Sequence, residues 1–400
     1  MDSDSQLEIL MNILLTSVRL PHALGVIRNL GRAGHDVYAT DTFRTSPGLS
    51  SKYVKKKIIT APPVFETLQF IEDLKSAIKE YQIDMLIPCF EEVFYIAKHR
   101  DELAELTDVR CPSFEMLAKL HNKESFTDLT RSLSLPIAET MTVTSEDGLR
   151  EAIETFPEYF GRAAFSRGGV ELFTNTGPLA GRIPIEDIHP TPDSPWVVQE
   201  FIHGEDICSF SFAHHGEVVA HSTYRHPLTI EHAGGIVFES MDEPESLKIV
   251  QAYARETNFH GSLSFDYLKT DKGLYMVECN PRPCAGVTLM SPEGFSGAVT
   301  NPDPENPYVV PEGESMQIDS AIIRNMFRDP QEIPEDLHHL FSGTHDVYSQ
   351  KGDRLPGLYQ ILSYSHVFAF RHRMHVRHHK HSDLMAAQFF DIAWDGEEIA

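Results

Sequence analysis

The chain has 400 residues and a formal net charge of −25 at pH 7. A chain of this length is too long for one compact core, so the length predicts two or three domains. The acidic balance argues against a nucleic-acid binder and against a protein that docks on anionic membranes. No run in the sequence approaches the ~20 apolar residues that a membrane-spanning helix needs.

The cysteines and the first residues of the chain indicate a cellular compartment. The five cysteines are scattered and form no CxxC pair, which argues against a disulfide framework or a structural zinc site and is typical of a reducing compartment. Residues 1–10 are acidic and polar, so we expect a disordered N-terminus there rather than a signal peptide. Together these features predict a cytoplasmic protein.

Residues 11–115 alternate between apolar strand-like runs and helical patterns, which predicts a Rossmann-like N-terminal domain with a parallel sheet. The expected elements are strands over residues 12–17, 37–40 and 85–88, helices over about 22–33 and 65–81, and a further helical segment to about residue 106. A dinucleotide site is the obvious interpretation, with Asp41 as the acid for the ribose. Residues 16–22 read TSVRLPH, however, and lack the GxGxxG glycines that let backbone approach a pyrophosphate. We therefore do not expect a nicotinamide cofactor.

The remainder of the chain is expected to form two further units. A helix over about residues 119–133 leads into the second unit, and Pro136 ends that helix. From Ala138 the pattern changes to short strands, helices and glycine turns. Residues 301–314 are rich in proline and acids and predict a loop or linker. A less regular C-terminal part follows from about Gln317.

The most informative stretch of the sequence is a predicted β-hairpin. Residues 262–268 (SLSFDYL) and 274–280 (LYMVECN) are strand-like, and residues 271–273 supply a turn between them. Pro281 cannot extend the strand pairing, so the chain is expected to leave the sheet there and present Arg282 beside the end of the hairpin.

The hairpin has one face that is rich in oxygen atoms. Because side chains two apart share a face of a strand, we expect Glu278 and Asn280 to point one way and Val277 and Cys279 to point into the core. Asp266 on the partner strand can face the same side as Glu278. Two carboxylates and an amide oxygen are ligands suited to Mg²⁺ bound beside substrate phosphates. A solvated acidic strand face is the competing interpretation.

Upstream of the hairpin, three features suggest a nucleotide phosphate site. Lys123 lies near the start of a helix at the domain junction, although most such lysines are merely solvated. Arg162 ends a strand and precedes residues 166–169, which include Gly168 and Gly169 and can fold backbone amides over phosphate oxygens. A plain hairpin turn is the alternative for that loop.

The third feature is residues 196–206, which read WVVQEFIHGED and predict a strand that runs into a loop and then an acid. Such a segment can offer adenine backbone donors and acceptors from Glu200 and Ile202, with Asp206 on the ribose hydroxyls. An ordinary strand and turn is the alternative.

The order of these features along the chain resembles the ATP-grasp superfamily over roughly residues 10 to 330. The motifs are closest to those of carbamoyl-phosphate synthetase and biotin carboxylase-like members, whose metal hairpin ends in E-x-N-P-R, as residues 278–282 do here. The resemblance implies a mixed α/β and α+β fold, with a Rossmann-like domain at 11–115, an ATP-grasp domain at 116–315 and a C-terminal extension at 316–400 that completes the substrate pocket.

The resemblance also implies ligands and residue roles. ATP and Mg²⁺ are the implied cofactors, with Mn²⁺ as a possible substitute. The residues implied for ATP are Lys123, Arg162, Gly168, Gly169, Glu200, Phe201, Ile202 and Asp206; those for the metal are Asp266, Glu278 and Asn280; and Arg282 is the implied catalytic residue. The sequence departs from the family pattern in three places, because many members have lysine at Arg162, glutamate at Asp206 and a third glycine where Val170 stands.

The chemistry implied by the resemblance is attack of a substrate carboxylate on the γ-phosphoryl group of ATP, followed by transfer of the acyl group to an amine. Small-molecule carboxylates and amines are the expected partners, and a homodimer is a further possibility. Two alternatives remain open: a bicarbonate-activating enzyme related to biotin carboxylase, and a nucleotide-binding protein without catalysis. The substrate pocket is expected to be built from loops such as residues 221–235.

The C-terminal part contains two further candidate sites. Arg324 is a candidate clamp for a substrate carboxylate, with an ordinary surface arginine as the alternative. Residues 366–381 contain six histidines among basic residues. On a helix, His372, His375 and His379 would share a face that could bind metal. The interpretation that we favour is a basic segment that docks on an acidic body.

Overall fold

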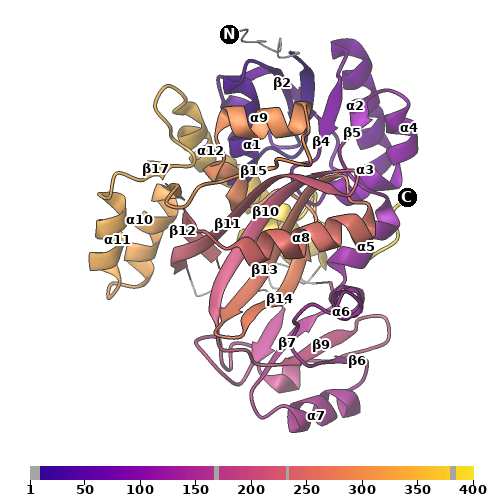
Figure 1. Cartoon of the computed structure of the whole chain (residues 1–400), viewed down its shortest axis with the longest axis vertical. Helices are drawn as coiled ribbons and strands as arrows, with labels where there is room; N and C mark the ends of the chain where they lie inside the picture. Colours follow the sequence, from indigo (N-terminus) through magenta and orange to yellow (C-terminus); the bar gives the residue numbers. More distant parts are fainter. Residues whose placement is uncertain (1–9, 166–170, 231–233, 379–383) are drawn as a thin grey trace.

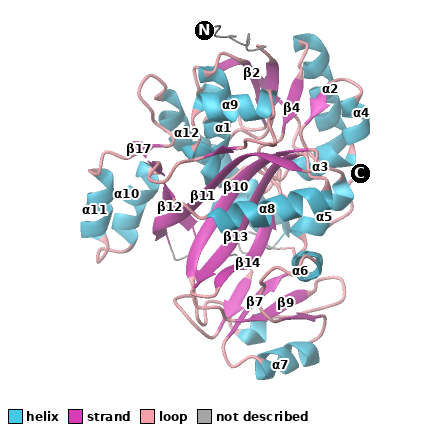
Figure 2. Cartoon of the chain, viewed as in Figure 1, coloured by secondary structure: helices cyan, strands magenta, loops and turns pink. Residues whose placement is uncertain are grey.

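A computed structural model describes residues 10–165, 171–230, 234–378 and 384–400. The expected disorder of the N-terminus concerns residues 1–10, of which all but the last lie outside this description. The described chain forms three sheets, stacked from top to bottom in Figure 1, with the N-terminal sheet uppermost and the smallest sheet at the bottom. Figure 2 shows that helices cover the N-terminal sheet and lie across the central one.

The N-terminal sheet is parallel throughout and has the strand order β3-β2-β1-β4-β5. Its order confirms the doubly wound arrangement that strand–helix alternation predicts. The elements of this unit are β1 (Asn12–Leu15), α1 (Pro21–Arg32), β2 (Asp36–Asp41), η1 (Gly48–Ser50), β3 (Val54–Ile59), α2 (Thr67–Tyr81), β4 (Met85–Ile87), α3 (Val93–Lys98), α4 (Arg100–Ala104) and β5 (Asp108–Val109). Strand β3 was not expected from the sequence, because its solvent-facing lysines interrupt the apolar run.

The acid at the end of β2 forms an ion pair within the protein. Asp41 is buried and forms an ion pair of 2.7 Å with Arg19, which lies in the turn after β1. Arg19 in turn pairs with Asp391 near the C-terminus at 2.7 Å. Asp41 is therefore held by a contact within the protein.

The helix expected over residues 119–133 is two helices, α5 (Phe114–His121) and α6 (Lys123–Ser132). Asn122 between them has extended backbone dihedrals, and its side chain accepts hydrogen bonds from the backbone N–H groups of Glu124 and Ser125. An asparagine in this role caps a new helix and interrupts the preceding one. The cap makes Lys123 the first residue of α6.

The smallest sheet is antiparallel, with the order β6-β9-β7-β8, and α7 packs against it. Its elements are β6 (Thr140–Val143), α7 (Glu146–Thr155), β7 (Tyr159–Ala163), β8 (Leu172–Thr174), η2 (Ile185–Asp187) and β9 (Trp196–Glu200). It forms a separate lobe at the bottom of Figure 1 and carries Arg162 on β7.

The central sheet has the order β14-β13-β10-β11-β12-β16-β17 and contains the expected hairpin. Its elements are β10 (Glu205–His214), β11 (Glu217–Ile230), β12 (Gly234–Ser240), α8 (Pro244–Thr257), β13 (Gly261–Thr270), β14 (Gly273–Asn280), η3 (Ala285–Leu289), α9 (Pro292–Thr300), β15 (Tyr308–Val309), β16 (Ser315–Gln317) and β17 (His345–Asp346).

One sequence expectation about this sheet was wrong. The described residues of 221–235 lie in β11 and β12 rather than in a loop, because polar residues such as His221 and Thr223 are buried and hydrogen-bonded inside the sheet. The predicted loop over 301–314 forms as expected except for the two-residue strand β15, which pairs with β11 in parallel.

The C-terminal part returns to the N-terminal unit. Its helices are α10 (Asp319–Arg328), α11 (Ile333–Leu340), α12 (Leu355–His378) and α13 (Leu384–Phe389). Trp394 packs against Phe94 and Phe114 of the N-terminal half, at ring distances of 4.6 and 5.3 Å. The last residues of the chain therefore belong to the core that the first third builds.

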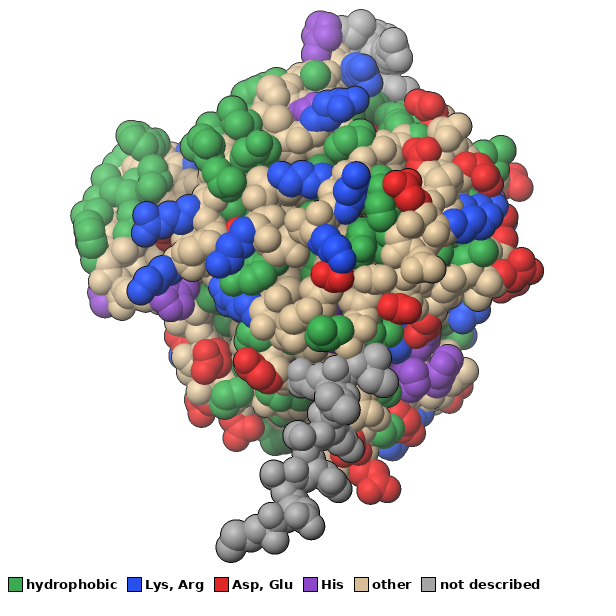
Figure 3. Space-filling model, turned by 90° about the horizontal axis from the view of Figure 1, so that it is seen from above, with side chains coloured by type: hydrophobic (Ala, Val, Ile, Leu, Met, Phe, Trp, Pro, Cys, Tyr) green, Lys and Arg blue, Asp and Glu red, His purple; other side chains and the backbone are tan. Residues whose placement is uncertain are grey.

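Figure 3 shows hydrophobic side chains gathered on the side of the molecule where α10 and α11 project. Phe327 and Phe341 are each 84 % exposed there. Among the described helices, none is both long and apolar enough to cross a membrane.

Candidate functional site

The oxygen-rich face of the hairpin forms as expected. In the β13–β14 pairing, Asp266 lies opposite Glu278 and Ser264 opposite Asn280. The Asn280 amide donates to Glu278 at 3.1 Å and to Asp266 at 3.3 Å, so the three side chains meet on one face. Cys279 faces the other way and is buried in the apolar core beneath α8. The strand period of two therefore predicts correctly that Glu278 and Asn280 share this face. The place of Asp266 opposite Glu278 depends in addition on a register shift in the pairing.

Val277 does not point into the core as expected. The register shifts between Asp266 and Tyr267, which leaves Val277 as an extra residue in β14. Its side chain is only half-buried, and its carbonyl oxygen accepts a hydrogen bond of 3.0 Å from Arg162. An extra residue of this kind is a β-bulge, which re-aims neighbouring side chains near functional sites.

Two cations reach the hairpin from other elements. Arg162 of β7 donates to a Glu278 oxygen at 2.9 Å, and the ammonium of Lys123 lies 3.9 Å from the same oxygen. Both cationic side chains are nearly buried, whereas the Glu278 side chain is 22 % exposed. Arg162 also donates to Gln199 on β9 at 3.2 Å. The small lobe, α6 and the central sheet therefore converge on one carboxylate.

The two carboxyl groups have opposite electrostatic surroundings. Burial opposes ionisation of Glu278, but Lys123 and Arg162 outweigh burial and lower its pKa to about 2. Burial raises the pKa of Asp266, and the negative charges of Glu278 and Asp206 raise it further. Glu278 is the permanently charged member of the pair, because it holds both cations.

Arg282 follows the hairpin and stays beside it. Its guanidinium donates to the side-chain oxygen of Asn280 at 3.1 Å and lies over the ring of Phe90, 4.4 Å from the centroid. Phe90 comes from the N-terminal unit, just after β4. Arg282 thus lies at the end of the hairpin, against Asn280, and Phe90 is a neighbour that the sequence did not indicate.

The predicted adenine segment forms a strand end followed by a loop. Glu200 ends β9, and Phe201 and Ile202 follow it, both half-buried. The N–H groups of Glu200 and Phe201 already donate at 2.9 Å to the carbonyls of Glu139 and Glu158. Two N–H groups of this segment are therefore already used within the protein.

Asp206 lies near the start of β10 and is exposed. It shares a face of that strand with Cys208, whose thiol donates to Asp266 at 3.1 Å. His226 of β11 lies 3.4 Å from Asp206. Sequence analysis missed Cys208 and His226, because their proximity depends on the β10–β11 register and no local motif marks it.

Other predicted residues are not brought into this site by the described structure. Gly168 and Gly169 lie outside the described residues. Arg324 is exposed on α10, and no described hydrogen bond or ion pair links it to the hairpin. His372 is exposed on α12, whereas the side chain of His375 and all of His379 lie outside the description. The favoured docking of that segment on an acidic body stays a prediction.

The donor set of the hairpin fits a magnesium ion. Asp266 and Glu278 supply carboxylate oxygens, which Mg²⁺ prefers. Asn280 turns its amide N–H groups towards these acids and its oxygen towards Arg282, so its amide would have to turn over to add a third oxygen. Lys123 and Arg162 stand next to these acids, as cations do where a nucleotide phosphate joins the metal. The residues present therefore suit a metal–phosphate complex.

A cavity of about 1250 Å³ lies between the small lobe and the N-terminal and C-terminal segments, and neither Arg162 nor the hairpin acids line it. It is lined by Ala163, Ala164 and Phe165, which directly follow Arg162, and by the start of α2. The C-terminal residues Phe389, Phe390 and Trp394 form another wall. Phe165 and Trp394 touch with their rings 5.4 Å apart.

No protein-family model matches this sequence, and no curated protein matches it either. Solved structures do match. The chain is similar to the N5-carboxyaminoimidazole synthetase from Staphylococcus aureus complexed with ADP, with a TM-score of 0.58, 13 % identity, and coverage of 80 % of this chain and 87 % of that one. It is also similar to the phosphoribosylamine–glycine ligase from Thermotoga maritima, with a TM-score of 0.56, 16 % identity, and coverage of 76 % and 78 %.

A third similar structure is the biotin carboxylase domain of the Hydrogenobacter thermophilus 2-oxoglutarate carboxylase, in complex with MgADP, ADP and bicarbonate. Its TM-score is 0.53 at 13 % identity, with coverage of 69 % of this chain and 65 % of that one. All three proteins have the ATP-grasp fold, and so does this chain, as the motif order predicted.

Proposed function

We propose that the protein is a Mg²⁺-dependent ligase that uses ATP to activate a substrate carboxylate as an acyl phosphate for attack by an amine. The observation that carries the proposal is the Glu278 carboxylate, which Lys123 and Arg162 share while Asp266 and Asn280 lie against it. Two acids beside two cations suit a metal–phosphate complex. In such a complex the acids face the metal ion and the cationic side chains face the phosphates, so that negative and positive charges alternate. A solvated acidic face would not hold two buried cations.

In this proposal the cations bind phosphate oxygens. Lys123 and Arg162 are held in place by Glu278, so they are positioned before ATP arrives and lose little side-chain freedom on binding. Asp266, Glu278 and Asn280 would hold the metal, which supplies charge neutralisation for the phosphates. Gly168 and Gly169 are proposed to complete the phosphate loop.

The adenine and ribose would lie along the segment that joins the small lobe to the central sheet. We assign adenine recognition to the carbonyl of Glu200 and the backbone of Ile202, with Phe201 supplying apolar contact. Asp206 is exposed and would accept hydrogen bonds from the ribose hydroxyls. Its neighbour His226 can orient that carboxylate.

The reaction then requires positioning and charge stabilisation rather than a protein nucleophile. A carboxylate oxygen of the substrate forms a bond to the γ-phosphorus while the bond to the β-phosphate oxygen breaks, which gives the acyl phosphate and ADP. The amine attacks the acyl carbon and expels inorganic phosphate. Arg282, oriented by Asn280 and Phe90, is proposed to stabilise the negative charge that develops on the acyl oxygen.

The cavity beside Ala163 is proposed to receive the amine substrate. Its walls combine aromatic side chains such as Phe165 and Trp394 with acidic ones such as Glu66 and Glu171, and no lysine or arginine is among the described residues that line it, so it suits a cationic group better than a carboxylate. The C-terminal extension at 316–400 would then complete the substrate pocket through its last residues. Arg324, being exposed on α10, has no such support from its position.

An assay of ADP release with purified protein, Mg·ATP and pooled carboxylic acids and amines tests this proposal. We expect turnover that requires both a carboxylate and an amine. Turnover with bicarbonate in place of an organic acid would favour the carboxylating reaction instead. Tight ATP binding with no turnover on any pool would favour a binding protein and contradict the ligase assignment. A cytoplasmic location and a homodimer stay predictions.

A further inference from the structure

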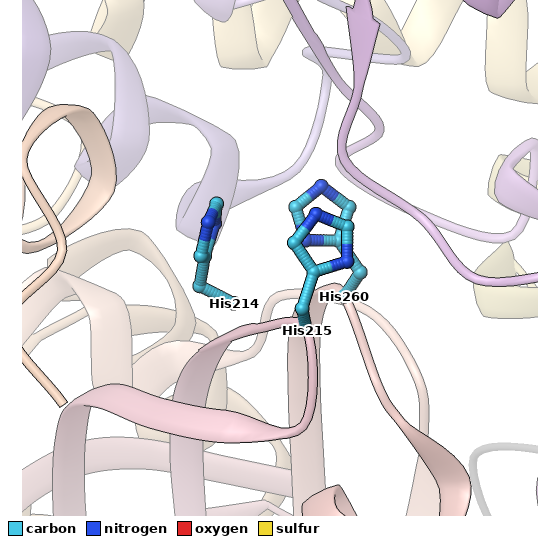
Figure 4. Close-up of side chains that lie close together, drawn as sticks. All are labelled: His214, His215 and His260. Atoms are coloured by element: carbon cyan, nitrogen blue, oxygen red, sulfur yellow. The ribbon is translucent and has the colours of Figure 1, made fainter.

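Three histidines meet at one end of the central sheet, away from the acidic hairpin face. His214 ends β10, His215 lies in the turn to β11, and His260 directly precedes β13. Figure 4 shows their rings standing side by side above the turn. One nitrogen from each ring lies within 4.8 Å of one nitrogen from each of the others. Asp266 lies six positions beyond His260, or roughly 20 Å along an extended strand, so the cluster is separate from the proposed ATP site.

The backbone fixes where these histidines lie. His215 and Gly216 form a two-residue turn with φ values of 47° and 88°, which is the left-handed geometry that tight hairpins require. Gly261 has φ of 119°, and a Cβ there would lie 2.2 Å from the carbonyl oxygen of Arg110. Glycine at this position therefore lets the chain at His260 press against the end of the N-terminal sheet.

His260 is oriented as a ligand would be. It is only 4 % exposed, and its Nε2 lies 3.5 Å from a carboxylate oxygen of Asp108. Its Nδ1 is buried and has no hydrogen-bond partner among the described residues. Buried polar atoms nearly always have a hydrogen-bond partner or a bound ligand, so the Nδ1 atom of His260 is a candidate ligand atom. A carboxylate on one ring nitrogen and a lone pair on the other is the arrangement found in metal-binding histidines.

We propose that His214, His215 and His260 bind a divalent transition metal ion of the imidazole-preferring class, such as Zn²⁺ or Co²⁺. Asp108 orients His260, and the exposed side of the turn leaves a position for water. The ion would join the β10–β11 turn to the segment before β13 within the central sheet, and the contact of His260 with Asp108 would connect it to the N-terminal unit.

Two adjustments accompany binding. The rings of His215 and His260 are stacked 4.1 Å apart at 7°, so their lone pairs lie in parallel planes and cannot meet at one ion. His215 is exposed and can rotate to remove this mismatch. Arg110 donates to Nδ1 of His214 at 2.8 Å, which places the proton of that ring on Nε2. Arg110 therefore competes with the metal and must release His214.

Titration of the full chain with Co²⁺, followed by its visible absorption bands, and with Zn²⁺ by calorimetry tests the proposal. His215→Asn removes a ligand and keeps the left-handed turn, which asparagine tolerates. We expect wild type to bind one metal ion per chain at this site. His215→Asn should bind that ion at least ~10-fold more weakly or not at all. Zn²⁺ should raise the melting temperature of wild type and leave that of His215→Asn nearly unchanged.

The histidines of residues 366–381 provide a built-in background, since they are identical in both proteins. Equal stoichiometry and affinity in wild type and His215→Asn would overturn the proposal, because all bound metal would then lie elsewhere. Arg110→Gln removes the competitor for His214 and is expected to bind Co²⁺ more tightly than wild type. Weaker binding by a folded Arg110→Gln protein would contradict the competition by Arg110.

Discussion

Replacing the two acids of the hairpin one at a time should change stability in different ways. Glu278→Gln removes the charge that Lys123 and Arg162 share, which leaves two nearly buried cations without their carboxylate. Asp266→Asn removes a charge that burial and the neighbouring acids already oppose. The first variant should therefore be destabilised and the second should not, although both lose a proposed metal ligand.

The magnitude follows from the pKa of Glu278. Its fall from the ordinary value of 4.5 to about 2 corresponds to about 3 kcal/mol, at about 1.4 kcal/mol per pKa unit. Because the pKa is lowered, this stabilisation is present above about pH 4.5 and disappears as the pH falls towards 2. Solvent reaches 22 % of the side chain, so we expect Glu278→Gln to lose about 2 to 3 kcal/mol at pH 7. Asp266→Asn should remain within about 1 kcal/mol of wild type.

Urea unfolding at pH 7 in the presence of EDTA measures both free energies without metal. The same proteins, tested for Mg²⁺-dependent binding of ATP by calorimetry, should both lose that dependence. An equal loss of stability in Asp266→Asn and Glu278→Gln would refute the opposite electrostatic roles assigned to the two acids.

Three further predictions concern Arg162, the buried partner of Arg19 and the buried His22. Arg162→Lys should keep measurable ATP binding, because a lysine retains the charge, whereas Arg162→Met should weaken ATP binding at least ~10-fold in calorimetry. Asp391→Asn should cost about 3 kcal/mol in urea unfolding, because it leaves Arg19 fully buried with one counterion instead of two. Burial and then the charge of Arg282 lower the pKa of His22 from 6.5 to about 3, so the folded state binds fewer protons than the unfolded state and stability falls as the pH is lowered. Between pH 6.5 and 5, the free energy of unfolding in urea should fall by about 2 kcal/mol less in His22→Gln than in wild type. An equal pH dependence in the two proteins would contradict the neutral state of His22.

The shared face of Glu278 and Asn280 was predictable because strand period is a local property. The position of Asp266 opposite Glu278 was not, because the register that the turn sets from Thr270 and Gly273 onward would bring Val277 opposite Asp266 without the bulge. Val277 was not predictable, because the bulge that turns it outward depends on pairing with β13 and on a hydrogen bond from the small lobe. A one-residue irregularity of this kind leaves no mark in hydrophobic alternation.

The N-terminal sheet was predictable from strand–helix alternation, whereas contacts across the chain were not. Asp391 reaches Arg19 across 372 positions, and Trp394 joins the core around Phe94. No local pattern in the last residues indicates these partners. Similarly, His226 meets Asp206 only because β10 and β11 pair in one particular register.

The formation of an acyl phosphate is the central claim, and oxygen transfer tests it most directly. A carboxylate substrate identified by ADP release would be labelled with oxygen-18 in its carboxyl group and turned over with Mg·ATP and the amine. The account predicts that the released inorganic phosphate carries one labelled oxygen, because the carboxylate attacks the γ-phosphorus and that oxygen leaves with phosphate. Phosphate without label, formed at the rate of product, would contradict carboxylate activation at this site.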